Sequence, residues 1–198
     1  MFKPLIFAAM LTPFLAHANV EVGQAAPDFS VTDAQGKSRS LGEFKGKTVV
    51  LEWHNPECPF VKKHYNTSVN MQTQQNAALS EGVVWLTVNS GAPGKQGAMD
   101  GATAIAKLGE LNATPSAYLI DSDGKMGGAY GAKTTPHMYV IDASGVLRYA
   151  GAIDSNPSAD AADIPAATQY VTQALAELKA GKPVSTPITK AYGCSVKY

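Results

Sequence analysis

The feature that most constrains the fold is a short apolar run that leads through a loop into a helix. Residues 48–53 read Thr-Val-Val-Leu-Glu-Trp, and only Glu52 interrupts their β-branched and apolar character. This composition favours a strand buried on both faces of a mainly parallel sheet. In residues 59–79 the apolar side chains recur on one helical face, which predicts a helix with Lys63 and residues 72–75 facing water. The chain is therefore expected to be an α/β protein with this strand near its centre.

The rest of the chain continues this alternation. Glycine-containing turns predict one hairpin near the N-terminus and a second one late in the chain. A last helix is predicted from an apolar stripe that begins at Ile164, with Pro165 in its first turn. The two hairpins are predicted at 31–40 and as strands 137–141 and 146–150. The remaining predicted elements are strands at 83–88 and 117–120 and helices at 98–111 and 125–130.

The first residues resemble an export signal. A basic start is followed by an apolar run over residues 5–15 and by Ala16-His17-Ala18, as in a cleavable signal peptide. The predicted organisation is a signal peptide at 1–18, one domain at 19–182 and an irregular C-terminal tail at 183–198. No later run approaches about 18 consecutive apolar residues, so no membrane insertion is expected. Export, most simply to a bacterial periplasm, is the predicted location.

Charge narrows the possible partners. The chain has 16 basic and 16 acidic residues, which gives a formal net charge of zero. The basic residues are scattered and form no patch for nucleic acid or an anionic membrane. Small molecules or other proteins are the expected partners.

The chain has two cysteines, Cys58 and Cys194. If Pro59 is the first helical residue, Cys58 is the N-cap, where unpaired backbone N–H groups favour a thiolate. The loop before it is expected to expose the sulfur. An inert, buried cysteine at a helix start is the alternative.

Five segments resemble a known family. They are residues 52–65 (Glu-Trp-His-Asn-Pro-Glu-Cys-Pro-Phe-Val-Lys-Lys-His-Tyr), 129–132, 135–136, 149–154 and 193–195. Together they are similar to the exported, peroxiredoxin-like branch of the redoxins, of AhpC/TSA type, within the thioredoxin-fold superfamily. The resemblance implies a thioredoxin-like fold with a central mixed sheet flanked by helices. It also implies thiol-based redox chemistry, either thiol-disulfide exchange or a peroxiredoxin-like antioxidant activity.

Two positions depart from the related families. Thioredoxins carry a second cysteine three residues after the first, where this chain has Val61, so a local disulfide cannot form. Peroxiredoxins carry a proline and a threonine where this chain has Leu51 and Asn55. The Asn55 amide could still orient a bound peroxide oxygen, which makes Asn55 a candidate catalytic residue.

The resemblance also implies roles for residues around Cys58. Glu52 corresponds to the buried acid that assists proton transfer in thioredoxins; the alternative is a glutamate that reaches water or pairs with a lysine. Pro136 corresponds to the cis-proline of the fold, and Thr135, Pro136 and Pro59 are the predicted substrate-binding residues.

Cys194 is the predicted resolving cysteine. Cys58 would attack a protein disulfide or a small peroxide, Cys194 would close a disulfide with Cys58, and an external reductant would reopen it. The alternatives are a permanent structural disulfide that pins the tail and two cysteines that stay unpaired.

No cofactor is expected, but metal binding is a second class of function. A thiolate with imidazoles suits copper(I) or zinc. The candidate ligands are His54, Cys58, His64 and His137, the last of which is expected near Cys58.

Overall fold

The computed structural model describes residues 20–198, so the predicted signal peptide lies outside the described residues. Its centre is a seven-stranded sheet in the order β2-β1-β5-β4-β3-β7-β8. Strand β3 pairs in parallel with β4 and antiparallel with β7, which makes the sheet mixed. The strands are β1 (Ser30–Asp33), β2 (Ser38–Ser40), β3 (Val49–Trp53), β4 (Val84–Asn89), β5 (Ala117–Ile120), β7 (His137–Ile141) and β8 (Leu147–Gly151).

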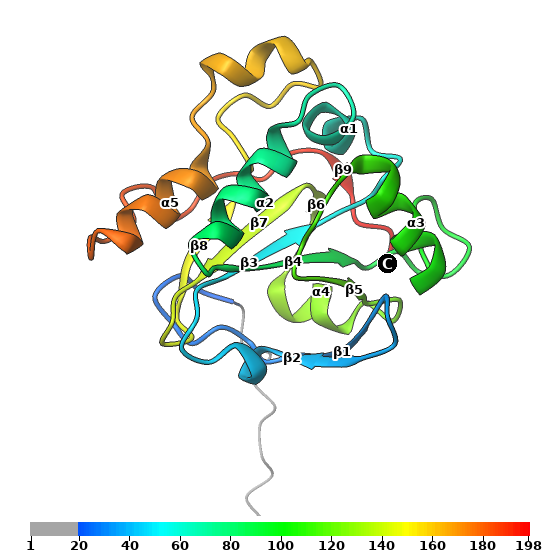
Figure 1. Ribbon diagram of the computed structural model, residues 1–198, viewed down its shortest axis with the longest axis horizontal. Helices are drawn as coiled ribbons and strands as arrows, with labels where there is room; N and C mark the ends of the chain where they lie inside the picture. The colour runs from blue at the N-terminus through cyan, green and yellow to red at the C-terminus, as the bar shows by residue number, and fades with distance from the viewer. Residues whose placement is uncertain (1–19) are drawn as a thin grey trace, which may run out of the picture.

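Helices lie on both sides of this sheet (Figure 1). They are α1 (Pro59–Tyr65), α2 (Asn70–Ser80), α3 (Gly101–Leu111), α4 (Lys125–Tyr130) and α5 (Tyr170–Lys179), with 3-10 helices at Leu41–Phe44 and Ala161–Ala166. Every side chain of β3 is buried. Val50 packs in the same core cluster as residues of α1, α2 and α5, whereas Val49 packs with residues of α4. The predicted α/β fold with a central, fully buried β3 is confirmed.

The helix predicted from 59 to 79 is wrong in one respect, because it is two helices with a break at residues 66–69. The hydroxyls of Thr67 and Ser68 both donate to the Lys63 carbonyl, at 3.1 and 2.7 Å. Such side chains compete with the next backbone N–H for the carbonyl and end the helix. Val69, predicted on the buried face, is consequently 68% exposed.

The last predicted helix is divided in the same way. Residues around Pro165 form the short 3-10 helix Ala161–Ala166, and α5 begins only at Tyr170. Proline lacks the N–H that a longer α-helix would need at this point.

The C-terminal tail returns to the sheet. Its residues 187–189 bond to the backbone of Ala150 on the edge strand β8. Beyond them β9 (Cys194–Ser195) pairs antiparallel with β6 (Thr134–Thr135). In Figure 1 this segment, coloured red, runs from α5 back to the end of the molecule that carries α1.

Within residues 20–198, the helices are too short or too polar for any of them to span a bilayer.

Candidate active site

Cys58 lies where β3 has ended and α1 begins. It is the N-cap of α1, with extended backbone angles, and Pro59 is the first helical residue, as predicted. Its backbone N–H donates to the Asn55 carbonyl at 3.1 Å, which closes the loop between strand and helix. The expected exposure of the sulfur is wrong, because Cys58 is only 1% exposed.

The Cys58 sulfur lies between two backbone groups from distant parts of the chain. Its thiol donates to the Thr135 carbonyl at 3.0 Å. The backbone N–H of Cys194 donates to the same sulfur at 3.4 Å. Thr135 and Cys194 are register partners of the β6–β9 pair, and both cysteines are free thiols. The structure therefore brings together the two cysteines that are 136 positions apart in sequence.

The surroundings of the two sulfurs shift their pKa values in opposite directions. Burial alone would raise the pKa of the Cys58 thiol, but hydrogen bonds from the Cys194 thiol and from the backbone N–H groups of Cys194 and Val61 outweigh it and lower that pKa. Burial, followed by the hydrogen bond to Cys58 and the charge on it, raises the pKa of the Cys194 thiol. Cys58 is therefore the sulfur that ionises first.

Gly193 allows Cys194 to approach in this way. Its φ of +131° lies in a region that side chains rarely adopt, and an added Cβ would lie 2.0 Å from the Thr135 carbonyl oxygen. Only glycine fits between the tail and β6 at this position.

The predicted substrate-binding residues lie around the same sulfur. The Thr135–Pro136 bond is cis, and Pro136 is buried, whereas Pro59 is exposed. Pro59 directly follows Cys58 in the chain, and Pro136 directly follows Thr135, whose carbonyl accepts from the Cys58 thiol. The backbone edge of Thr135 is already paired with β9. The protein's own tail thus occupies the edge of β6.

Glu52 is completely buried in the middle of β3. Its carboxylate accepts from Tyr65 Oη at 2.7 Å, Trp85 Nε1 at 2.8 Å, Gln75 Nε2 at 3.2 Å and Thr87 Oγ1 at 3.2 Å. Burial raises its pKa, although these hydrogen bonds oppose the rise. The alternative of a glutamate that reaches water or pairs with a lysine does not fit this environment.

Asn55 is committed to the loop that precedes Cys58. Its Oδ1 accepts from the Glu57 backbone N–H at 2.9 Å, and its Nδ2 donates to the Gln96 carbonyl at 3.3 Å. The side chain also packs tightly on Gly97, where an added Cβ would lie 1.9 Å from Oδ1. These contacts favour a structural role in the loop over the orientation of a peroxide.

The histidines that were considered as metal ligands lie apart. His54 Nδ1 lies 2.8 Å from Tyr118 Oη, and His64 Nδ1 lies 2.8 Å from Asn70 Nδ2. His137 packs against Tyr139 with tilted rings, on the face of β7 opposite to Met138, and Met138 belongs to the core cluster of Cys58. Side chains alternate along a strand, so the His137 ring lies on the face of β7 opposite to the core cluster that contains Cys58. Among residues 20–198, no three histidine, cysteine or carboxylate side chains form a group that could hold a metal ion.

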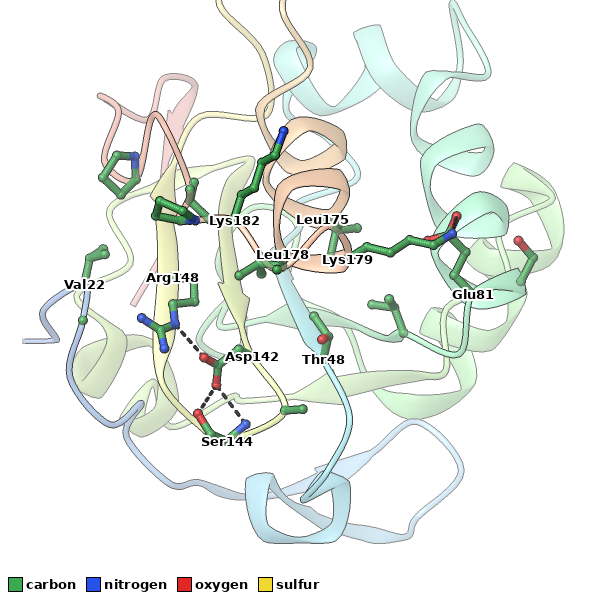
Figure 2. Close-up of a pocket in the computed structure, with 18 residues that line it drawn as sticks. Val22, Thr48, Glu81, Asp142, Ser144, Arg148, Leu175, Leu178, Lys179 and Lys182 are labelled. Atoms are coloured by element: carbon green, nitrogen blue, oxygen red, sulfur yellow. Dashed lines mark hydrogen bonds and ion pairs between the residues drawn. The ribbon is translucent and has the colours of Figure 1, made fainter.

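A large cavity lies away from the cysteines. It has a volume of about 940 Å³ and lies between α5, the β7–β8 turn and the residues before β3 (Figure 2). Thr48 lines it and precedes β3, whereas Cys58 follows β3, so the cavity and the cysteines lie at opposite ends of the strand. On its walls Asp142 forms an ion pair with Arg148, and Glu81 forms one with Lys179.

The sequence did not reveal a buried ionic cluster next to the cysteines. Lys63 was predicted to face water, but its side chain is fully buried and its Nζ lies 3.3 Å from Asp154 Oδ2. The Tyr192 hydroxyl donates to the other oxygen of Asp154. Asp154 lies in one of the segments that carry the family resemblance, which was the available signal for it.

Known proteins resemble this chain over the same fold. A thiol-disulfide oxidoreductase ResA from Bacillus thuringiensis is 32% identical over 126 residues, which cover 57% of this chain and 71% of that protein. An uncharacterized conserved protein from Geobacillus kaustophilus has a structure with a TM-score of 0.76 and 25% identity, covering 90% of this chain and 92% of its own. The thioredoxin domain of a thiol-disulfide oxidoreductase from Bacteroides vulgatus shares the fold, with a TM-score of 0.51, 20% identity and coverage of 65% and 86%.

The predicted thioredoxin-like fold is therefore confirmed, and the chain is similar to thiol-disulfide oxidoreductases. Cys58 lies within the part of the chain that matches a family model, and the Cys194 segment lies beyond it. That model is the AhpC/TSA family and it matches residues 22–150, more than half of the 198 residues, so the protein belongs to the AhpC/TSA family.

Proposed function

We propose that this protein is an exported thiol-disulfide oxidoreductase in which Cys58 attacks and Cys194 resolves. The observation that carries the proposal is the position of the Cys194 backbone N–H, 3.4 Å from the Cys58 sulfur. A disulfide between the two residues requires only local adjustment of the tail. Similarity to the ResA proteins supports the same class of chemistry.

The reaction has two exchanges. The Cys58 thiolate attacks one sulfur of a substrate disulfide, forms a mixed disulfide and expels the other substrate sulfur as a thiolate. Cys194, as a thiolate, then attacks the Cys58 sulfur, expels the second substrate thiolate and closes the Cys58–Cys194 disulfide. The substrate gains two electrons and the protein loses two, which an external dithiol returns. The reverse sequence oxidises a dithiol substrate.

The opposite pKa shifts fit this order. Cys58 ionises first, and its charge is one cause of the raised pKa of Cys194. That charge disappears when Cys58 enters the mixed disulfide, so Cys194 then ionises more readily. Each sulfur is favoured as the nucleophile at the step where it is needed.

Two further residues differ in how well the structure supports their roles. Glu52 remains the candidate for proton exchange in the second step, because it is buried, has a raised pKa and lies on the strand that leads to Cys58. Asn55 has its amide engaged by the Gln96 carbonyl, so we favour a disulfide over a peroxide as the substrate.

Export rests on the N-terminal pattern, since residues 1–18 resemble a signal peptide. Sequencing of the protein from a periplasmic fraction is expected to give an N-terminus near Asn19. A protein that keeps Met1 in the cytosol would contradict export.

The catalytic proposal is tested by equilibrating the reduced protein with mixtures of reduced and oxidised glutathione. Mass spectrometry is expected to find a reversible Cys58–Cys194 disulfide in the wild type, a trapped glutathione adduct in Cys194→Ser and no reaction in Cys58→Ser. A structural staple would instead resist reduction, with a potential below about −300 mV. Full activity of Cys58→Ser on both a protein disulfide and hydrogen peroxide would refute the proposal.

A further inference from the structure

The buried position of Cys58 raises the question of how a substrate reaches it. The residue is 1% exposed, and its sulfur is flanked by the Thr135 carbonyl and the Cys194 backbone N–H. Cys194 belongs to β9, so a bulky disulfide can approach only when β9 moves away from β6. The contacts that hold the tail therefore bear on how a substrate reaches Cys58.

One of these contacts involves Tyr192, two residues before Cys194. Its hydroxyl donates to Asp154 Oδ1, and its ring packs edge-on against Phe60 with centroids 5.7 Å apart. Lys63 Nζ lies 3.3 Å from Asp154 Oδ2 and 5.8 Å from the centre of the Tyr192 ring. Phe60 and Lys63 both belong to α1, the helix that Cys58 caps. We call Lys63, Asp154 and Tyr192 the tyrosine latch.

The latch adds a buried, charged acceptor to the contacts that hold the tail. The side chains of Lys63 and Asp154 are fully buried, and buried charges need every available partner. Lys63 Nζ also donates to the Asn156 carbonyl at 3.1 Å, so Tyr192 is the tail's own contribution to this network. When the tail leaves, Asp154 loses a charge-assisted hydrogen bond, which is about twice as strong as a neutral one.

On the other side of β9 the hydrogen bonds that anchor the tail join neutral groups. They include the backbone bonds of the Val196 N–H to the Lys133 carbonyl at 3.0 Å and of the Ala92 N–H to the Lys197 carbonyl at 2.8 Å. There the Tyr198 hydroxyl donates to the Ala132 carbonyl at 2.8 Å, a bond between neutral groups, and Tyr198 is 49% exposed. The two tyrosines therefore offer a comparison between a charged and a neutral anchor of the same segment.

We propose that Tyr192, through the tyrosine latch, is a specificity-determining residue that keeps β9 over Cys58 and so restricts bulky disulfides more than small ones. The proposal rests on the proposed function, because it assumes that Cys58 attacks disulfides. A small disulfide needs only a local opening, whereas a peptide disulfide needs β9 to leave β6.

The test isolates the first exchange in a Cys194→Ser background. The Cys58 thiolate then attacks the probe, forms a stable mixed disulfide and releases a coloured nitrothiobenzoate anion. One probe is the small symmetric disulfide of nitrothiobenzoate, and the other is a long cysteine peptide joined to the same leaving group. Because the same thiolate attacks both probes, the ratio of the two rate constants cancels any change in the pKa of Cys58.

In this background Tyr192→Phe is expected to raise the peptide rate by about tenfold and to change the small-probe rate by less than about threefold. Tyr198→Phe is expected to change the ratio in the same direction but less. The matched control is Tyr130→Phe, which removes a buried hydroxyl that donates to the Pro27 carbonyl on the other face of the sheet. It is expected to leave the ratio unchanged.

The outcomes separate the two proposals. An unchanged ratio in Tyr192→Phe, or a larger change in Tyr198→Phe, would overturn the latch while leaving Cys58 as the nucleophile. If the Cys194→Ser parent reacts with neither probe, even after residues 190–198 are deleted, the proposed function itself fails.

Discussion

Cys58 is positioned by the centre of the sheet, whereas Cys194 is positioned by a two-residue strand at its margin. Cys58 follows β3, whose side chains are all buried, and it caps α1. Residues of α1 belong to the same core cluster as Cys58. Cys194 depends on the β6–β9 pair, on Gly193 and on the tyrosine latch. Substitutions near Cys58 should therefore change the stability of the fold, and substitutions near Cys194 should mainly change the reaction.

The largest expected effect concerns Asp154, which belongs to both regions. Asp154→Ala leaves the fully buried Lys63 ammonium without its counter-charge and is expected to cost about 3–5 kcal/mol in the free energy of unfolding. Urea denaturation measures this loss. In the matched double variant Lys63→Met with Asp154→Leu, which removes both charges, most of the stability is expected to return. If Asp154→Ala lowers the free energy of unfolding by less than about 1 kcal/mol, the ion pair of Lys63 with Asp154 does not link the region of Cys58 to that of Cys194.

Gly193→Ala tests the tail alone. In the structure, where both cysteines are free thiols, the added Cβ would overlap the Thr135 carbonyl. The tail can relieve this overlap by leaving β6, which takes Cys194 away from Cys58 and opposes the disulfide. The effective concentration of Cys194 at Cys58, measured against glutathione, is expected to fall at least about tenfold, since strain at such a backbone position costs about 1–3 kcal/mol. The free energy of unfolding of the reduced protein should change by less than about 2 kcal/mol.

The control for this variant is Gly128→Ala in α4. An added Cβ there meets nothing within 4 Å, and alanine is favoured over glycine inside a helix. Its stability should rise slightly and its disulfide equilibrium should stay as in the wild type. An equal effect of both variants on the disulfide equilibrium would mean that β9 is not held as the structure indicates.

The same contrast explains what the sequence could predict. The run at β3, the N-cap position of Cys58 and the α/β alternation depend on local patterns, and these predictions are confirmed. The exposure of Cys58 was predicted wrongly because the group that covers its sulfur comes from Cys194, far along the chain. A pairing as short as β6–β9 has no periodicity to detect.

The helical periodicity also gave a wrong prediction of which polar side chains face water. The polar side of the predicted 59–79 helix was assigned to water, yet Lys63 and Gln75 are buried. Their partners, Asp154 and Glu52, come from a loop and from β3, so periodicity alone could not reveal that these polar groups are satisfied inside the protein. Pairing of buried polar groups is a tertiary property.

Glu52→Gln is expected to change how stability depends on pH. The pKa of Glu52 is raised in the folded state, so its contribution is fully present below the pKa of the unfolded chain and is lost as the pH rises through the folded pKa. The amide cannot ionise, and Gln75 Oε1, which has no partner, can accept its N–H after rotation. The stability of Glu52→Gln relative to wild type should therefore increase with pH in denaturation curves. A parallel pH dependence in both proteins would contradict the raised pKa.

The smallest expected effect is on the ionisation of Cys58 when the partner thiol is removed. Cys194→Ala keeps the backbone N–H but deletes the thiol hydrogen bond that, after burial, is the leading influence on the pKa of Cys58. The pKa of Cys58 should rise, so the midpoint of its alkylation rate against pH should move to higher pH. Ser195→Ala, whose hydroxyl accepts from Lys197 instead, is the neighbouring control and should leave the midpoint in place. A midpoint that stays fixed in Cys194→Ala would mean that the tail stabilises the Cys58 thiolate only through its backbone N–H. The Cys194 thiol would then have no influence on the ionisation of Cys58.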